Sequence, residues 1–146
     1  MRAHRTCLVL ALTMVGAGAF AQNADPVATL PNEIEFKARP FAPPGAVLYG
    51  DPRKPGLYVT RGKLPPGFKV MPHSHPDERT TVVLSGTFYF GIGEQWDESK
   101  MKAFPAGSFL SEPPNTPHYA WAKDGEVIVQ FTGAGPSGTT VIPQKR

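Results

Sequence analysis

Two histidines separated by one residue give the sequence its clearest chemical signal. His73 and His75 lie in the stretch MPHSHPDERTTVVLSG, which runs from Met71 to Gly86. Side chains at positions i and i+2 of a β-strand project from the same face, so both imidazoles are expected to point the same way. Imidazole is a common ligand of Zn, Fe, Ni and Cu. The pair therefore predicts part of a metal site.

A third histidine lies in a second patterned segment. His118 ends the stretch PAGSFLSEPPNTPH, which covers residues 105–118. The chain has four histidines, and His4 falls in an N-terminal segment that we expect to be removed. Each remaining histidine thus belongs to one of the two patterned segments, which strengthens the prediction of a shared metal site.

The first residues have the pattern of a secretory signal peptide. Residues 1–21 begin with Arg2 and Arg5, continue with an apolar run and end in small residues around Ala21. We expect cleavage after Ala21 and a periplasmic or secreted protein. A membrane anchor is the alternative, but the apolar run is too short to span comfortably, so no membrane association is expected after cleavage.

Cleavage would leave 125 of the 146 residues, a length that suits one domain with one core. It would also remove two basic residues and Cys7, the single cysteine. The mature chain would then carry 13 basic and 12 acidic residues and no thiol chemistry. No basic block or basic helix is present, so nucleic acid is not expected as a partner.

The rest of the chain divides into an arm and a β-rich domain. Residues 22–45 are polar and contain several prolines, which predicts an extended N-terminal arm with a short strand at residues 34–37; a flexible leader is the alternative. Residues 46–146 form short runs rich in Val, Thr, Phe and Tyr, separated by Gly and Pro every 8–12 residues or so. This spacing favours an all-β sandwich or barrel, with one helical candidate at residues 94–100.

The first patterned segment resembles the first motif of the cupin superfamily, a group of small β-barrels. That motif is a Gly, five residues, His-x-His, three or four residues, Glu, six residues and Gly. The sequence supplies Gly67, His73, His75 and Gly86 at the matching distances. The position of the glutamate is held by Arg79.

The second segment resembles the second cupin motif: a Gly, five residues, Pro-x-Gly, two residues, His, three residues and Asn. The sequence supplies Gly107, Pro113 and His118, with Asn115 in place of the inner glycine and Ala122 in place of the last Asn. Asparagine tolerates the left-handed backbone that glycine adopts in turns, so the first departure is mild.

The resemblance implies an all-β, single-domain cupin barrel of the jelly-roll type. It also implies that His73, His75 and His118 converge inside the barrel on a divalent metal ion. Three imidazoles suit Zn with a water, or Fe, Mn, Ni or Cu with open positions, so the identity of the metal stays open. A barrel that has kept its histidines without binding metal is the alternative.

Arg79 raises a separate question, because a guanidinium has no lone pair for a metal. In one interpretation it pairs with an acidic substrate bound at the metal, which makes it a catalytic and substrate-binding residue. In the other it turns to the rim of the barrel and pairs with Asp77 or Glu112. Glu78 would replace the missing ligand only through a bulge.

Gln130 is a second candidate for substrate binding. It lies within the apolar strand EVIVQF and would reach a substrate or a metal-bound water if its face were the interior. A solvent-facing glutamine on the outer surface is the alternative. Phe88 and Phe90 share one face of their strand, and we expect such aromatic residues to form core.

Three functions remain open. The first is a metal-dependent enzyme acting on a small, acidic molecule; oxygenase chemistry is typical of three-histidine cupins, some of which hold iron without a Glu. The second is a non-catalytic periplasmic protein that binds a metal or small ligand, and the third is a structural barrel. Cupins commonly pair through edge strands, so we also expect a homodimer. One fold hosts many chemistries, so fold alone does not choose.

Overall fold

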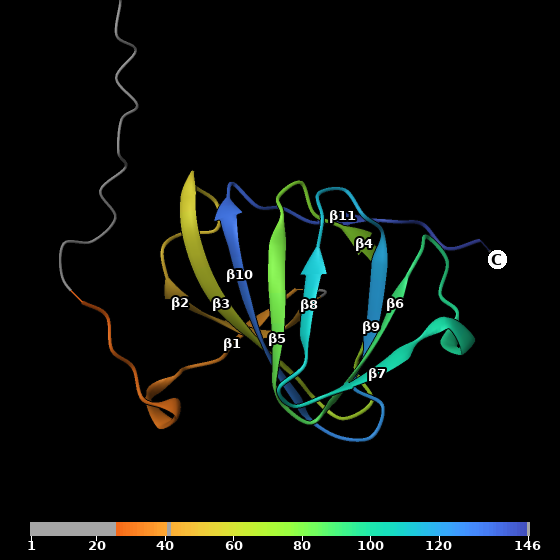
Figure 1. The fold of residues 1–146 in the computed structure, drawn as a ribbon, viewed down its shortest axis with the longest axis horizontal. Coiled ribbons are helices and arrows are strands. Elements are labelled where there is room, and N and C mark those ends of the chain that lie inside the picture. Colours follow the sequence, from red (N-terminus) through yellow and green to blue (C-terminus); the bar gives the residue numbers. More distant parts are fainter. Residues whose placement is uncertain (1–25, 41, 146) are drawn as a thin grey trace, which may run out of the picture.

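The chain is described by a computed structural model that covers residues 26–40 and 42–145. Its strands form two antiparallel sheets that face one another (Figure 1). The predicted signal peptide and its cleavage site lie outside the described residues. Within the described residues, no helix is long and apolar enough to cross a membrane.

Sheet A has the strand order β1-β2-β3-β10-β5-β8. The strands span β1 Lys37–Arg39, β2 Ala42–Tyr49, β3 Gly56–Leu64, β10 Val127–Gly135, β5 Arg79–Ser85 and β8 Phe109–Glu112. The strands β1 to β3 are consecutive in the chain, whereas β10 lies between β3 and β5 and pairs with both. The pairing of β5 with β8 brings residues from both cupin-like segments to this sheet.

Sheet B has the order β11-β4-β9-β6-β7. Its strands span β11 Thr140–Val141, β4 Lys69–Ser74, β9 His118–Trp121, β6 Thr87–Ile92 and β7 Lys102–Pro105. Two 3₁₀ turns, η1 Pro31–Glu33 and η2 Glu98–Lys100, are the helical elements of the described residues. The predicted all-β barrel with two sheets is confirmed.

The core lies between the sheets and follows the period-two alternation of the strands. Apolar side chains at alternate positions point inward, and β10 shows this with Val127 and Val129, both fully buried. The core cluster consists of Leu64, Val83, Phe88, Phe90, Leu110, Ala120, Ala122, Val127 and Val129. The expectation that Phe88 and Phe90 belong to the core is therefore confirmed.

Tight turns fix how the strands connect. Gly86 joins β5 to β6 with a φ of 75°, and a Cβ there would lie 2.3 Å from the carbonyl oxygen of Glu126. A residue with a side chain would be strained at this turn on both counts. Asn115, at the glycine position of the second motif, has a φ of 56°, so it does adopt the left-handed backbone.

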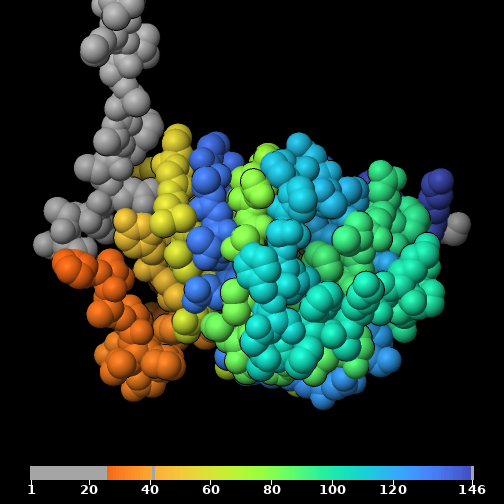
Figure 2. All heavy atoms as spheres, in the orientation of Figure 1, coloured from red at the N-terminus to blue at the C-terminus, as the bar shows by residue number. Residues whose placement is uncertain are grey.

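Three predicted boundaries shift. The short strand expected over residues 34–37 forms over Lys37–Arg39 instead, because its pairing with β2 sets its place. β2 begins at Ala42, so the last residues of the predicted arm belong to sheet A. The helical candidate at residues 94–100 forms only the short turn η2, held at its start by the Asp97 carboxylate, which accepts from the Ser99 backbone N–H. Figure 2 shows the N-terminal segment (orange) beside β2 and β3 (yellow).

Candidate functional site

The three predicted ligands come from two neighbouring strands of sheet B. His73 lies on β4, His75 directly follows that strand, and His118 begins β9. His73 and His118 are cross-strand partners in the β4–β9 ladder. The backbone N–H of Asn115 donates to the carbonyl oxygen of His75 over 2.7 Å, so the left-handed turn of the second segment is tied to the first. The expected convergence of the histidines is confirmed.

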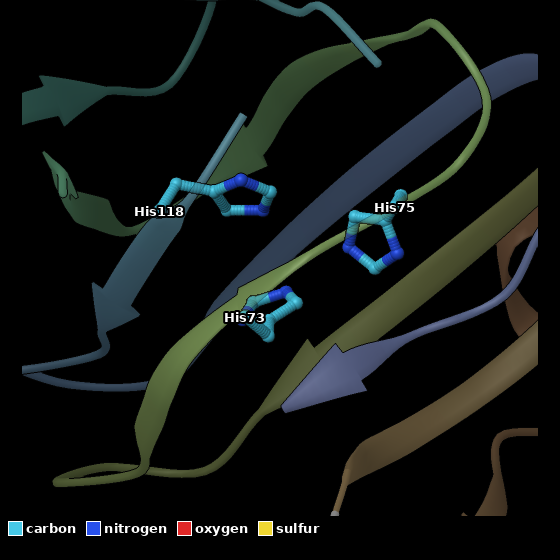
Figure 3. A group of neighbouring side chains, drawn as sticks. All are labelled: His73, His75 and His118. Atoms are coloured by element: carbon cyan, nitrogen blue, oxygen red, sulfur yellow. The ribbon is translucent and has the colours of Figure 1, made fainter. Parts of the chain in front are cut away.

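The three imidazole rings face a common point (Figure 3). One ring nitrogen from each residue lies within 4.8 Å of those of the other two. Each Nδ1 contacts a backbone carbonyl oxygen: Met71 at 2.8 Å for His73, Gly138 at 2.5 Å for His75 and Thr116 at 2.9 Å for His118. A carbonyl can only accept, so each Nδ1 carries the hydrogen and each Nε2 keeps its lone pair.

Burial keeps these rings neutral. It lowers the pKa of His73 to about 3, with the neighbouring His118 adding to the shift. It lowers the pKa of His75 to about 4, with Arg79 as the second cause. The pKa of His118 is also lowered, again mainly by burial. At neutral pH the site therefore offers three neutral imidazoles, the protonation state that a divalent metal requires.

Arg79 lies beside this cluster, on β5 of the opposite sheet. Its cross-strand partner on β8 is Glu112, and its Nε donates to Glu112 Oε2 over 2.7 Å. Its Nη2 contacts His75 Nε2, and its guanidinium lies 4.8 Å from the ring centroid of Phe131. The side chain is only 13 % exposed, so Arg79 points into the barrel and is not turned out to its rim.

Glu112 completes the polar part of the site. Its Oε1 accepts from the Thr81 hydroxyl, and its side chain is 4 % exposed. Burial alone would raise the pKa of Glu112, but Arg79, followed by His118 and Thr81, lowers it below its ordinary value. Its Oε2 lies 3.4 Å from His118 Nε2. The cation that compensates this carboxylate is Arg79, so the donor set that fits a divalent metal is the three neutral imidazoles.

A cavity of about 590 Å³ opens onto the cluster. Its floor carries the three histidines, Arg79 and Glu112, and its volume suits a small molecule. Most of the wall is apolar and is formed by Leu64, Phe68, Val70, Met71, Phe88, Phe90, Ala120, Phe131 and Val141. The small side chain of Ala120 also lines this cavity.

Three residues considered from the sequence lie elsewhere. Gln130 is between the inward-facing Val129 and Phe131, so it is on the outer face of β10, where its Oε1 accepts from Arg61 over 3.0 Å. It does not line the cavity and is not part of the site. Glu78 is exposed, so it does not replace the missing ligand. Asp77 is buried, but it accepts from the Tyr58 hydroxyl over 2.5 Å and does not pair with Arg79.

Two cavity residues were not identified as site residues. Glu112 was considered only as a partner of Arg79 at the rim, although an acidic residue just before a Pro-Pro turn and six residues before His118 was a usable signal. Arg39 lines the cavity from β1. Nothing in the local sequence of the arm indicates this, because it depends on how β1 and β2 fold back along sheet A.

Comparison with known proteins supports the fold. A family model described as a cupin domain matches residues 60–132, which is half of the chain. A search of functionally curated proteins finds no match.

Solved structures of the same fold are distant in sequence. An RmlC-like cupin from Shewanella frigidimarina is 17 % identical, with a TM-score of 0.59 over 73 % of this chain and 87 % of that one. The polyketide cyclase RemF from Streptomyces resistomycificus is 13 % identical, with a TM-score of 0.67 over 82 % and 87 %. The DMSP lyase DddQ from Ruegeria pomeroyi is 14 % identical, with a TM-score of 0.61 over 81 % and 72 %. At these identities the likeness shows the fold alone.

Proposed function

The chain belongs to the cupin domain family, and on this premise we propose that it is a divalent-metal-dependent enzyme that acts on a small acidic molecule. The observation that carries the proposal is the convergence of three neutral imidazoles, those of His73, His75 and His118, in the lining of the cavity. Arg79 Nη2 contacts His75 Nε2 and would have to give way to a bound metal. Two proteins of the same fold, a polyketide cyclase and a DMSP lyase, are named as enzymes. We take the chemistry to be dioxygenase-like, with Fe first and Zn, Mn, Ni and Cu as the other candidates.

A bound divalent cation would supply Lewis-acid catalysis, and iron would add redox chemistry with O₂. The protein's part is to hold the three imidazoles in one tautomer. The carbonyl oxygens of Met71, Gly138 and Thr116 do this by accepting from the Nδ1 atoms. Because these acceptors belong to the backbone, the rings are oriented without any further titratable group.

Arg79 is proposed to bind the carboxylate of the substrate. Its Nε is engaged by Glu112 and its Nη2 contacts His75, whereas Nη1 has no hydrogen-bond partner among residues 26–40 and 42–145. The guanidinium thus retains free donors beside the metal site. The pKa of Glu112 is lowered, so this carboxylate is a weak base at neutral pH. We therefore assign Glu112 to positioning Arg79 rather than to proton transfer.

Elemental analysis of the protein purified from its own host tests the proposal. We expect about one equivalent of a divalent transition metal, its loss in His73→Ala/His118→Ala, and its retention in Arg79→Gln. Oxygen uptake with a set of small carboxylic acids should accompany iron. Bound metal without turnover of any substrate would favour the non-catalytic binding protein instead. Protein without metal after purification under non-chelating conditions would overturn the proposal and favour a structural barrel.

We also propose that the protein is exported and that it forms a homodimer. We propose that residues 1–21 direct secretion and are cleaved after Ala21. Mass spectrometry of the protein recovered from the periplasm or medium should then give an N-terminus at Gln22, and an intact Met1 would contradict this.

We further propose a homodimer, which size-exclusion chromatography with light scattering would show as twice the mass of one mature chain.

A further inference from the structure

A second arginine reaches the cavity from the N-terminal part of the chain. Arg39, the last residue of β1, lines the cavity together with Ala42 and Pro43 of β2, whereas Arg79 lies deeper, beside the histidines. Arg39 is exposed to solvent, which places it at the mouth. The two guanidinium groups therefore come from separate strands and occupy different depths of one cavity.

The position of Arg39 is built by its neighbours. Its Nε and Nη2 both donate to the carbonyl oxygen of Pro43, over 3.0 Å and 2.8 Å. The guanidinium also packs closely against Gly45, where an added Cβ would lie 2.6 Å from the guanidinium carbon Cζ of Arg39. A larger residue at position 45 would displace it. Arg39 is thus held in one place, although its strand is short.

The charges on the cavity wall do not balance. Lys69 is paired with Glu98 over 3.0 Å, and Arg79 with Glu112 over 2.7 Å. Among residues 26–40 and 42–145, Arg39 has no carboxylate partner; its hydrogen bonds go to a neutral carbonyl. Partial burial, followed by the positive charge of Arg79, lowers the pKa of Arg39.

The three histidines are neutral, so they do not offset the excess positive charge of the cavity wall. With a divalent cation bound, the floor of the cavity would carry two further positive charges, and the mouth would keep the charge of Arg39. A ligand with a single carboxylate would balance only one of these regions. Arginine binds carboxylates with two parallel hydrogen bonds, and each guanidinium is therefore a separate recognition point for one carboxylate.

We infer that the cavity recognises a small dicarboxylate, with one carboxylate held at the histidine cluster by Arg79 and the other held at the mouth by Arg39. This inference rests on the proposed function for the inner carboxylate, but the outer contact belongs to Arg39 alone. It gives the N-terminal hairpin formed by β1 and β2 a role in selecting the substrate. Apolar walls between the two arginines would accommodate the carbon chain of the ligand.

Isothermal titration calorimetry with matched acids tests this inference. Succinate, glutarate and adipate would be compared with the monoacids of equal length, butyrate, valerate and hexanoate, on zinc-loaded and metal-free protein. We expect at least one diacid to bind the zinc-loaded protein about 10- to 100-fold more tightly than its monoacid, the range for a hydrogen bond to a charged group. Arg39→Gln should bring the ratio of diacid to monoacid affinity close to one, and Arg39→Lys should restore part of the preference.

Lys37→Gln is the matched control, since it removes one positive charge from the same strand at a residue that does not line this cavity. It should keep the preference for the diacid. Equal binding of diacids and monoacids by the wild type, or an unchanged preference in Arg39→Gln, would overturn the inference. If the protein fails to bind zinc but still selects diacids through Arg39, the proposed function fails while the dicarboxylate site stands.

Discussion

Acidification should destabilise the metal-free protein over a defined pH range, because two buried histidines resist protonation. His73 is surrounded by His75, His118 and Arg79, and His75 by Arg79, His118 and Glu112. The pKa values in the folded state are about 3 for His73 and about 4 for His75, against an ordinary value of 6.5. Between these limits the unfolded chain binds more protons than the folded one, so stability falls as the pH falls.

The size of the effect follows from these pKa values. At pH 5 an unfolded histidine is almost fully protonated, whereas both folded histidines are still neutral. Moving from pH 7 to pH 5 therefore costs about 2 kcal/mol for each ring, or about 4 kcal/mol for the two. Domains of this size are typically stable by only about 5–15 kcal/mol. The loss should begin near pH 6.5 and continue until the folded rings protonate near pH 4 and below.

Urea denaturation of the metal-free protein, followed by the fluorescence of Trp96 and Trp121, gives the free energy of unfolding at each pH. The control is His73→Asn/His75→Asn, which removes both titrating rings. For each protein, the quantity compared is the difference in the free energy of unfolding between pH 7 and pH 5. This difference should be about 4 kcal/mol smaller in the double variant than in the wild type. Nitrogen NMR should also show neutral rings protonated at Nδ1 down to pH 5. An equal pH dependence in the two proteins, or rings that titrate near pH 6.5, would refute this reasoning.

Two further predictions concern the residues that support the site. Glu112→Gln leaves the buried Arg79 guanidinium without its counter-ion, so the free energy of unfolding measured in urea should drop by about 3 kcal/mol. The double variant Arg79→Met/Glu112→Leu removes both charges and should lose less stability. A larger loss in the double variant would argue against a buried ion pair. Gly91→Ala would bring a Cβ within 2.4 Å of the ring of Tyr119, which is fully buried, so overpacking should cost about 1–3 kcal/mol and lower the Tm. Gly125→Ala is the control, because an added Cβ there meets nothing within 4 Å, and its Tm should be nearly that of the wild type. Similar Tm values for the two variants would contradict the close packing at Gly91.

The convergence of the histidines was predicted from the resemblance of two segments to the cupin motifs; local spacing alone gives only the common face of His73 and His75. The spacing of His73 and His75 sets their common face on β4, and the turn around Asn115 returns the second segment to the same place. The turn and the spacing are properties of short stretches of sequence, but the meeting of the two segments depends on the pairing of β4 with β9, which the family resemblance implied.

The partner of Arg79 could not be settled from the sequence, because it depends on register. Arg79 faces Glu112 only through the pairing of β5 with β8, two strands that are separated by β6 and β7 in the chain. A shift of one residue in this register would turn one of the two side chains to the other face of the sheet. Asp77, the other candidate, is nearer in sequence but is bound to Tyr58.

The orientation of Gln130 could not be predicted for a different reason. Alternation along β10 tells which residues share a face, but not which face is inside. A strand whose two faces both carry apolar residues, such as Val129 and Ile128, gives no signal for the choice. The structure decides it, because Val129 is fully buried and Phe131 lines the cavity, so Gln130 faces outward to Arg61.

The pairing of Arg79 with Glu112 also bears on how the site would handle charge. A protein carboxylate that coordinates a metal ion cancels part of the positive charge of that ion. Here the carboxylate of Glu112 is already engaged by Arg79 and Thr81. A divalent ion held by three neutral imidazoles would then keep most of its charge, and this charge attracts an external anion. With arginine at the position of the motif glutamate, the charge of a bound metal would be neutralised by the substrate and not by the protein, which supports the proposed binding of an acidic molecule.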